Sequence, residues 1–170
     1  LEEAQLSDES KKTAHLSPET VRGDVSFEHV HFGYDPEKII INDFSAEAKA
    51  GQKVAIVGPT GAGKTTIVNL LMRFYDPKSG RIEIDGRNIG EINRENVREQ
   101  FSMVLQDTWL KSGTIAENIA YGKPEATRAE IIEAAKAAHA HGFIKRMSDG
   151  YDTVISEDGG NLSQGQKQLL

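Results

Sequence analysis

The sequence KVAIVGPTGAGKTT, residues 53–66, decides the fold of this chain. Residues 58–65 fit the pattern G-x-x-x-x-G-K-[ST] at every fixed position. The run KVAIV predicts a buried strand before the loop, and KTTIVNLLMRF at residues 64–74 predicts a helix after it. This order directs backbone N–H groups and the positive end of a helix toward an anion. The stretch therefore predicts a phosphate-binding loop, or P-loop.

The residue types of the loop suit the phosphates of ATP or a similar nucleotide. Gly61 and Gly63 lack Cβ atoms, so the backbone can curl around phosphate oxygens. Lys64 is expected to reach the β- and γ-phosphates, and the Thr65 hydroxyl is expected to bind Mg²⁺. The predicted phosphate-binding residues are Gly58, Pro59, Thr60, Gly61, Ala62, Gly63, Lys64, Thr65 and Thr66. The alternative is a plain glycine-rich turn with a surface lysine.

The composition is that of an ordinary globular domain. The chain has 170 residues, of which 38% are hydrophobic and 27% charged, and its net charge is −6. This acidic balance, without a stretch dense in Lys or Arg, argues against nucleic acid as the main partner. The sequence contains no cysteine, which excludes disulfides and thiolate zinc sites. No apolar run approaches the roughly 20 residues of a membrane-spanning helix.

Hydrophobic patterning predicts strands in the first half of the chain and helices in the second. Residues 1–20 are polar and predict a linker or disordered arm, with an exposed helix as the alternative. The β-type runs are residues 25–32, 53–57, 81–85 and 101–106. The helical runs are residues 64–74, 115–121 and 128–147, the last broken near residues 139–142. The pattern predicts an α/β fold.

A second motif, LSQGQ at residues 162–166, marks another helix start. Ser163 takes the N-cap position, and Gln166 takes the capping-box position three residues later. Taken alone, the motif predicts either a plain helix cap or a second anion site.

The order of the motifs resembles the nucleotide-binding domain of ABC transporters. A P-loop is followed by VLQD at residues 104–107 and then by a helical stretch that ends in LSQGQ. The resemblance runs from about Val25 to the end, and SGTIAENI at residues 112–119 is similar to exporter-type domains. It implies an incomplete P-loop NTPase-type core with an antiparallel β subdomain and a helical subdomain. The implied parts are an arm from a preceding transmembrane domain at residues 1–24, the β subdomain and P-loop part at 25–106, and the helical subdomain at 107–170.

The resemblance also implies roles for residues outside the P-loop. Tyr34 matches the aromatic residue that stacks on adenine, although an ordinary loop tyrosine is the alternative. Gln106 matches the glutamine that contacts Mg²⁺ or the attacking water and senses the transmembrane domain; the alternative is a polar residue at a strand end. Gln106 and Lys64 are the expected catalytic residues, and Thr65 and Gln106 are the expected Mg²⁺ ligands.

The signature motif is implied to complete the site of a second domain. In the family, two domains pair head to tail, and this motif covers the γ-phosphate held by the P-loop of the other. Ser163, Gly165 and Gln166 are the expected ATP contacts, with Gln164 standing where glycine is commoner. The residues EDGG at 157–160 are implied to lie near the transmembrane coupling helices, or else form a solvated acidic loop.

The implied function is that of the ATP-binding domain of an ABC exporter, which couples Mg-ATP binding and hydrolysis to export across a membrane. Its expected partners are ATP, an identical or different second nucleotide-binding domain, and a transmembrane domain, but no nucleic acid. The expected location is the cytoplasmic face of the cell membrane, with attachment through a transmembrane domain outside this segment.

The end of the sequence bears on catalysis. The sequence stops at Leu170, before the positions where the family has a Mg²⁺-associated aspartate, a general-base glutamate and a switch histidine, and none of its five histidines suits the last role. We expect the intact protein to be a translocating ATPase and this segment to bind nucleotide but hydrolyse it poorly. The alternatives are a nucleotide-binding or dimerising fragment without turnover, and another P-loop enzyme such as a small-molecule kinase. Gln106 and LSQGQ count against the kinase.

Overall fold

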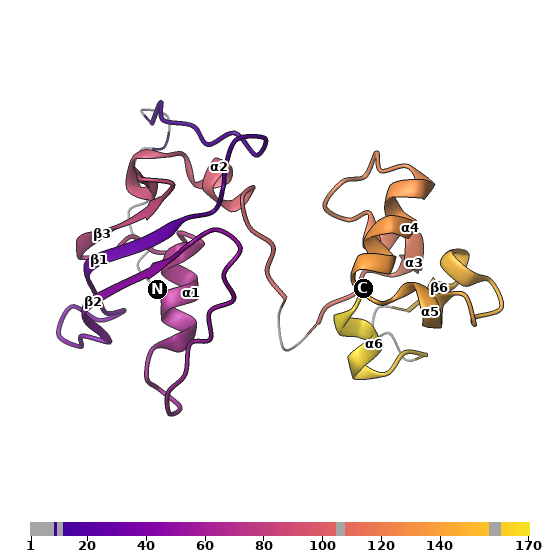
Figure 1. The fold of residues 1–170 in the computed structure, drawn as a ribbon. Helices are drawn as coiled ribbons and strands as arrows, with labels where there is room; N and C mark the ends of the chain where they lie inside the picture. The colour runs from indigo at the N-terminus through magenta and orange to yellow at the C-terminus, as the bar shows by residue number, and fades with distance from the viewer. Residues whose placement is uncertain (1–8, 10–11, 105–107, 157–160) are drawn as a thin grey trace. The chain divides into compact units, whose positions relative to one another are not determined.

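The computed structural model describes residues 9, 12–104, 108–156 and 161–170 (Figure 1). These residues form two compact units, which divide between Ser102 and Met103. The first unit contains the β-sheet and the P-loop, and the second contains the LSQGQ motif.

The first unit contains a four-stranded antiparallel sheet with the strand order β2-β1-β3-β4. Its strands are β1 Val25–Phe32, β2 Ile41–Ala48, β3 Ser79–Ile84 and β4 Arg87–Asn88. Val25 of β1 pairs with Ala48 on one side and Ile84 on the other. The predicted strand at residues 25–32 is confirmed, and β3 covers most of the run predicted at 81–85. Strand β2 was not predicted, because Asn42 and Asp43 interrupt its apolar residues.

Helix α1, Lys64–Leu71, lies against this sheet (Figure 1). Its apolar side places Ile67 and Leu70 in one buried cluster with Phe27 and Val30 of the central strand. The predicted helix reached residue 74, but the observed helix ends earlier because Arg73 has a φ of 51°. A left-handed residue just beyond the last turn stops a helix.

Two of the predicted strands are wrong. Residues 53–57 adopt no regular strand, and Val54, Ile56 and Val57 are 62%, 44% and 86% exposed. Residues 101–104 also lie outside any strand, while 105 and 106 fall outside the described residues. An apolar run of this kind becomes a strand only when neighbours accept its hydrogen bonds and cover its faces. Among the described strands of the first unit, none pairs with either segment.

The N-terminal residues 12–22, which we call the strap, belong to the first unit and pack against its core. Leu16 is only 2% exposed and belongs to the main core cluster. The side chain of Asn96 accepts a hydrogen bond from the Leu16 N–H at 2.7 Å and donates one to its carbonyl oxygen at 2.9 Å. Just before the strap, Glu9 pairs with the buried guanidinium of Arg73 at 3.1 Å. Leu16 and the clamp formed by the Asn96 side chain thus dock the strap, together with Arg87, which donates to the His15 carbonyl oxygen, and Asp85, which accepts from the Arg22 N–H.

Short helices are the main regular elements of the second unit. They are α3 Ile115–Ile119, α4 Arg128–Ala137, α5 His141–Ile144 and α6 Gln164–Gln168. Strands β5 Gly113–Thr114 and β6 Val154–Ile155 pair antiparallel. The predicted helices are confirmed, and the predicted break occurs where His139 has a φ of 60°. Ile115, Ile144 and Ile155 are fully buried at the centre of this unit.

A further α-helix, α2 Arg94–Arg98, belongs to the first unit and carries the clamp residue Asn96, and short 3-10 helices form at Ile89–Glu91 and Gly150–Asp152. Of the helices that the structure describes, none is both long enough and apolar enough to cross a membrane. The predicted α/β class, with an antiparallel β subdomain, a helical subdomain and an incomplete P-loop core, is confirmed.

Candidate functional site: the P-loop

The P-loop depends on two glycines with left-handed backbone. Gly61 and Gly63 both have a φ of 85°, a conformation that residues with a Cβ rarely adopt. A Cβ on Gly63 would lie 2.7 Å from Cδ1 of Ile41, whereas a Cβ on Gly61 would meet no described atom within 4 Å. Glycine is therefore needed at both positions for conformation, and at Gly63 also for space.

Lys64 folds back over the loop that precedes it. Its Nζ donates hydrogen bonds to the carbonyl oxygens of Gly58 and Pro59, both at 2.8 Å. The Ala62 N–H donates to the same Pro59 oxygen at 3.2 Å, which closes a tight turn. Among the described residues, no side chain caps the first turn of α1 and no acidic residue stands there. The positive end of the helix and the ammonium group are thus combined at one loop, as anion binding requires.

Tyr34 contacts the helix that follows the P-loop. Its hydroxyl lies 3.3 Å from Oγ1 of Thr66 and accepts a hydrogen bond from Nδ2 of Asn69, also at 3.3 Å. Thr66 is buried, whereas Thr65 next to it is exposed. The structure therefore brings together two predicted site residues, Tyr34 and Thr66, that lie 32 positions apart.

The LSQGQ motif begins helix α6 in the second unit. Ser163 Oγ accepts a hydrogen bond from the Gln166 N–H at 3.3 Å, and Gln166 Oε1 accepts one from the Ser163 N–H at 2.9 Å. The predicted capping box is confirmed. Gly165 lies in the first turn, and an added Cβ would meet no described atom within 4 Å. The predicted residues Gln106 and 157–160 lie outside the described residues.

The family model of ABC transporters matches residues 41–170, which include the P-loop and the LSQGQ motif. The chain belongs to the ABC transporter family. The fatty acid ABC transporter ATP-binding/permease protein of Mycobacterium bovis is 56% identical over 165 residues, covering 96% of this chain and 26% of that protein. The β-(1→2)glucan export ATP-binding/permease protein NdvA of Bartonella henselae is 49% identical over 163 residues, covering 95% and 27%.

This chain is also similar to a solved structure of an ABC exporter. The structure of a bacterial Atm1-family ABC exporter with ATP bound matches with a TM-score of 0.80 and 49% sequence identity. The match covers 87% of this chain and 26% of the exporter chain. The ABC transporter chain thus spans about a quarter of the length of these relatives.

Two residues that contact the predicted site residue Tyr34 were not predicted from the sequence: Asn69 and Tyr75. Asn69 donates a hydrogen bond to the Tyr34 hydroxyl, and the ring centroids of Tyr75 and Tyr34 lie 5.0 Å apart. Tyr75 comes directly after the helix predicted at residues 64–74, and its local sequence does not point to Tyr34. The signal for Asn69 was its spacing of three residues from Thr66, which places both side chains on one side of a helix.

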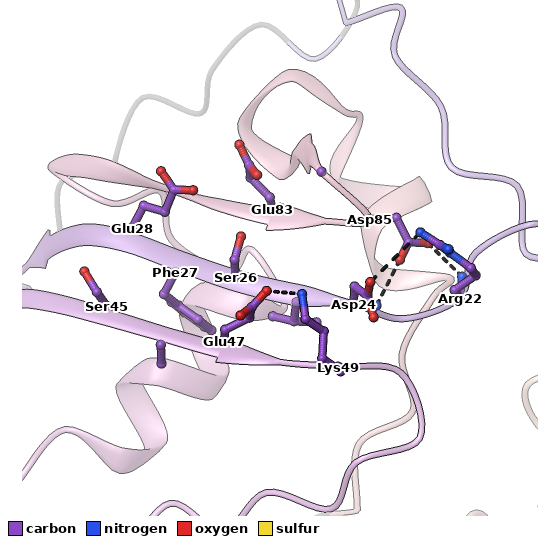
Figure 2. A pocket seen from close by; sticks show the side chains of 13 residues that line it. Arg22, Asp24, Ser26, Phe27, Glu28, Ser45, Glu47, Lys49, Glu83 and Asp85 are labelled. Atoms are coloured by element: carbon purple, nitrogen blue, oxygen red, sulfur yellow. Dashed lines mark hydrogen bonds and ion pairs between the residues drawn. The ribbon is translucent and has the colours of Figure 1, made fainter.

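A separate hollow of about 790 Å³ lies on one face of the sheet (Figure 2). Its carboxylates have partners: Glu47 pairs with Lys49, and Asp85 accepts hydrogen bonds from the N–H groups of Arg22, Gly23 and Asp24 at 2.7 to 3.2 Å (Figure 2). Burial alone would raise the pKa of Asp85, but these N–H donors hold it below its ordinary value. The hollow contains no predicted site residue. Within the described ranges, no group of three or more His, Asp or Glu side chains could hold a metal ion.

Proposed function

We propose that this chain is the ATP-binding domain of an ABC exporter and that it binds Mg-ATP through the P-loop. The observation that carries the proposal is the geometry of residues 58–65: two left-handed glycines and an ammonium group sit at an uncapped helix start. Relatives that are named ATP-binding proteins, and a similar exporter structure with ATP bound, support it.

The side chains suit distinct parts of the nucleotide. Lys64 would turn from the carbonyl oxygens of Gly58 and Pro59 to the β- and γ-phosphates. The exposed Thr65 hydroxyl, in the first turn of α1, would hold Mg²⁺ together with Gln106. Mg²⁺, when bound, neutralises charge on the β- and γ-phosphates. Tyr34, half-exposed and tied to α1, would stack on the base.

The intact transporter would hydrolyse ATP in a head-to-tail pair of such domains. In this arrangement the Ser163 hydroxyl and the N-terminus of α6 would face the γ-phosphate held by the other domain, because both present hydrogen-bond donors. Energy from binding and hydrolysis would drive export through a transmembrane domain. The domain would then work at the cytoplasmic face of the membrane.

The test of nucleotide binding uses the intact transporter and the variant Lys64→Ala. A hydrogen bond to a charged group is worth about 1.5–3 kcal/mol, so the affinity for Mg-ATP should fall by roughly 10- to 150-fold. Lys136→Ala is the matched control, because this exposed lysine pairs with Glu133 on α4. Equal affinities in wild type and Lys64→Ala would contradict the proposal.

The paired arrangement needs a separate test, because Ser163 also caps α6. Asparagine caps helices about as well as serine, so Ser163→Asn should leave the helix intact while it removes the hydroxyl. We expect the ATPase rate of the intact transporter to fall with little change in the ATP affinity of the P-loop. An unchanged rate would argue against a γ-phosphate contact by Ser163. Binding of ATP without any phosphate release would favour a nucleotide-binding protein without turnover.

A further inference from the structure

We infer that Asn69 and Tyr75 are positioning residues that hold Tyr34 ready for the nucleotide base. The inference rests on the proposed function and names the part of the site that recognises the purine. It depends on contacts within the first unit alone.

The first support is a cluster of three aromatic rings. The centroids of Phe32 and Tyr34 lie 5.0 Å apart at an interplanar angle of 88°, and those of Tyr34 and Tyr75 lie 5.0 Å apart at 80°. The ring centroids of Phe32 and Tyr75 lie 5.6 Å apart, with the rings tilted at 49°. Edge-to-face contacts at these distances are favourable and directional. Phe32 is buried in the core and anchors the cluster, whereas Tyr34 and Tyr75 stay 51% and 42% exposed.

The second support is the double attachment of the Tyr34 hydroxyl. Thr66 and Asn69 lie three positions apart on α1, and both bond the hydroxyl at 3.3 Å. Lys64 begins the same helix. Tyr34 is therefore tied to the element that carries the phosphate-binding lysine, so α1 fixes the separation between the ring and the phosphates.

The third support is the closed backbone of the loop that carries Tyr34. The Ile40 N–H donates to the Phe32 carbonyl oxygen at 2.8 Å, and the Lys38 N–H donates to the Asp35 oxygen at 3.2 Å. A Cβ on Gly33 would lie 1.9 Å from the Lys38 carbonyl oxygen, so only glycine allows this close approach. The loop holds the backbone of Tyr34, while Asn69 and Tyr75 hold its side chain.

These contacts reduce the entropy that Tyr34 loses when a base stacks on it. A freely rotating side chain must give up its rotamers on binding, whereas one that is already held gives up fewer. Removal of Asn69 or Tyr75 should therefore weaken only those ligands that carry a base. Inorganic tripolyphosphate shares the phosphates of ATP but lacks the base, and it is the discriminating probe.

The experiment measures the dissociation constants of Mg-ATP and Mg-tripolyphosphate for the intact transporter. Tyr75→Leu and Asn69→Ala should each weaken ATP binding by about 3- to 10-fold, the size expected for loss of one such contact. Tripolyphosphate affinity should stay within about twofold, and Tyr75→Phe should restore ATP binding because it keeps the ring. Phe74→Leu is the matched control: Phe74 is 41% exposed, and its ring contacts Arg98 at 4.9 Å.

The outcomes separate this inference from the proposed function. If wild-type protein binds neither ligand, the proposed function fails and the inference fails with it. If wild type binds both, and Tyr75→Leu leaves ATP binding unchanged or weakens both ligands equally, only the inference is overturned. A selective loss of ATP affinity in both positioning variants, with Phe74→Leu unaffected, supports it.

Discussion

Replacing Asn96 with alanine should release the strap from the first unit. Asn96 is only 6% exposed, and its side chain satisfies both main-chain groups of Leu16, at 2.7 and 2.9 Å. The variant Asn96→Ala removes both partners at once while Leu16 keeps its place in the sequence. Leu16 then has to remain buried with two unsatisfied groups or detach into water.

The magnitude follows from these two routes. Each buried main-chain group left without a partner costs about 1–3 kcal/mol. The loss cannot exceed the free energy that docks the strap, to which burial of Leu16 contributes about 1.5–3 kcal/mol. We therefore expect the free energy of local opening at Leu16 to fall by about 2–3 kcal/mol. Its amide should then exchange about 30- to 150-fold faster.

Hydrogen–deuterium exchange on the intact transporter measures this effect in peptides that cover residues 12–22. Asn93→Ala is the control on the same helix, because Asn93 caps α2 by accepting the Glu95 N–H at 2.9 Å. Loss of that cap costs about 1 kcal/mol but leaves the strap clamped. The reasoning is refuted if strap exchange in Asn96→Ala equals that of wild type, or if Asn93→Ala loosens the strap equally.

Two further predictions concern the P-loop and α4. Gly61→Ala should lower the free energy of unfolding by about 1–2 kcal/mol, because alanine is strained in the left-handed backbone conformation. Gly63→Ala should lower it by more, because the new Cβ must also displace Ile41. Denaturant unfolding measures both values, and the reverse ranking would contradict this reasoning. The Lys123 ammonium is the largest cause that lowers the pKa of Glu130, from 4.5 to about 2, so stability present above pH 4.5 should be lost as pH falls toward 2. Glu130→Gln should flatten this dependence in melting temperatures, and an unchanged slope would argue against it.

The parts of the fold that depend on local chemistry could be predicted from sequence. The run at residues 25–32 alternates apolar and polar side chains on either side of the polar pair Glu28 and His29, and the Ser163 cap is predicted from two residues three positions apart. The cap was confirmed because its cause lies within the segment itself, and the strand was confirmed because β2 and β3 pair with it on both sides. The strand predicted at residues 53–57 was wrong, because an apolar run does not show whether neighbouring strands pair with it.

The candidate site divides in the same way. The P-loop residues stand in one short stretch, so their spacing alone predicted them. The contacts of Tyr34 with Asn69 and Tyr75 join positions 35 and 41 residues apart, and only the fold of β1 and α1 brings them together. The docking of the strap could not be predicted for a related reason, because its composition does not show that Leu16 becomes buried in the core.

The hydrogen bonds of Lys64 have a consequence for which ligands the P-loop would prefer. The ammonium group already makes two hydrogen bonds of 2.8 Å to the loop's own carbonyl oxygens. If Lys64 turns to the phosphates as proposed, it would exchange these bonds for bonds to phosphate oxygens, so the number of lysine hydrogen bonds would stay nearly constant. The gain in free energy would then come mainly from the full negative charge that replaces a carbonyl dipole beside the ammonium group. On this proposal the loop would favour multiply charged phosphates over neutral ligands of equal size, because a neutral ligand would offer the lysine no stronger hydrogen bonds than those that it gives up.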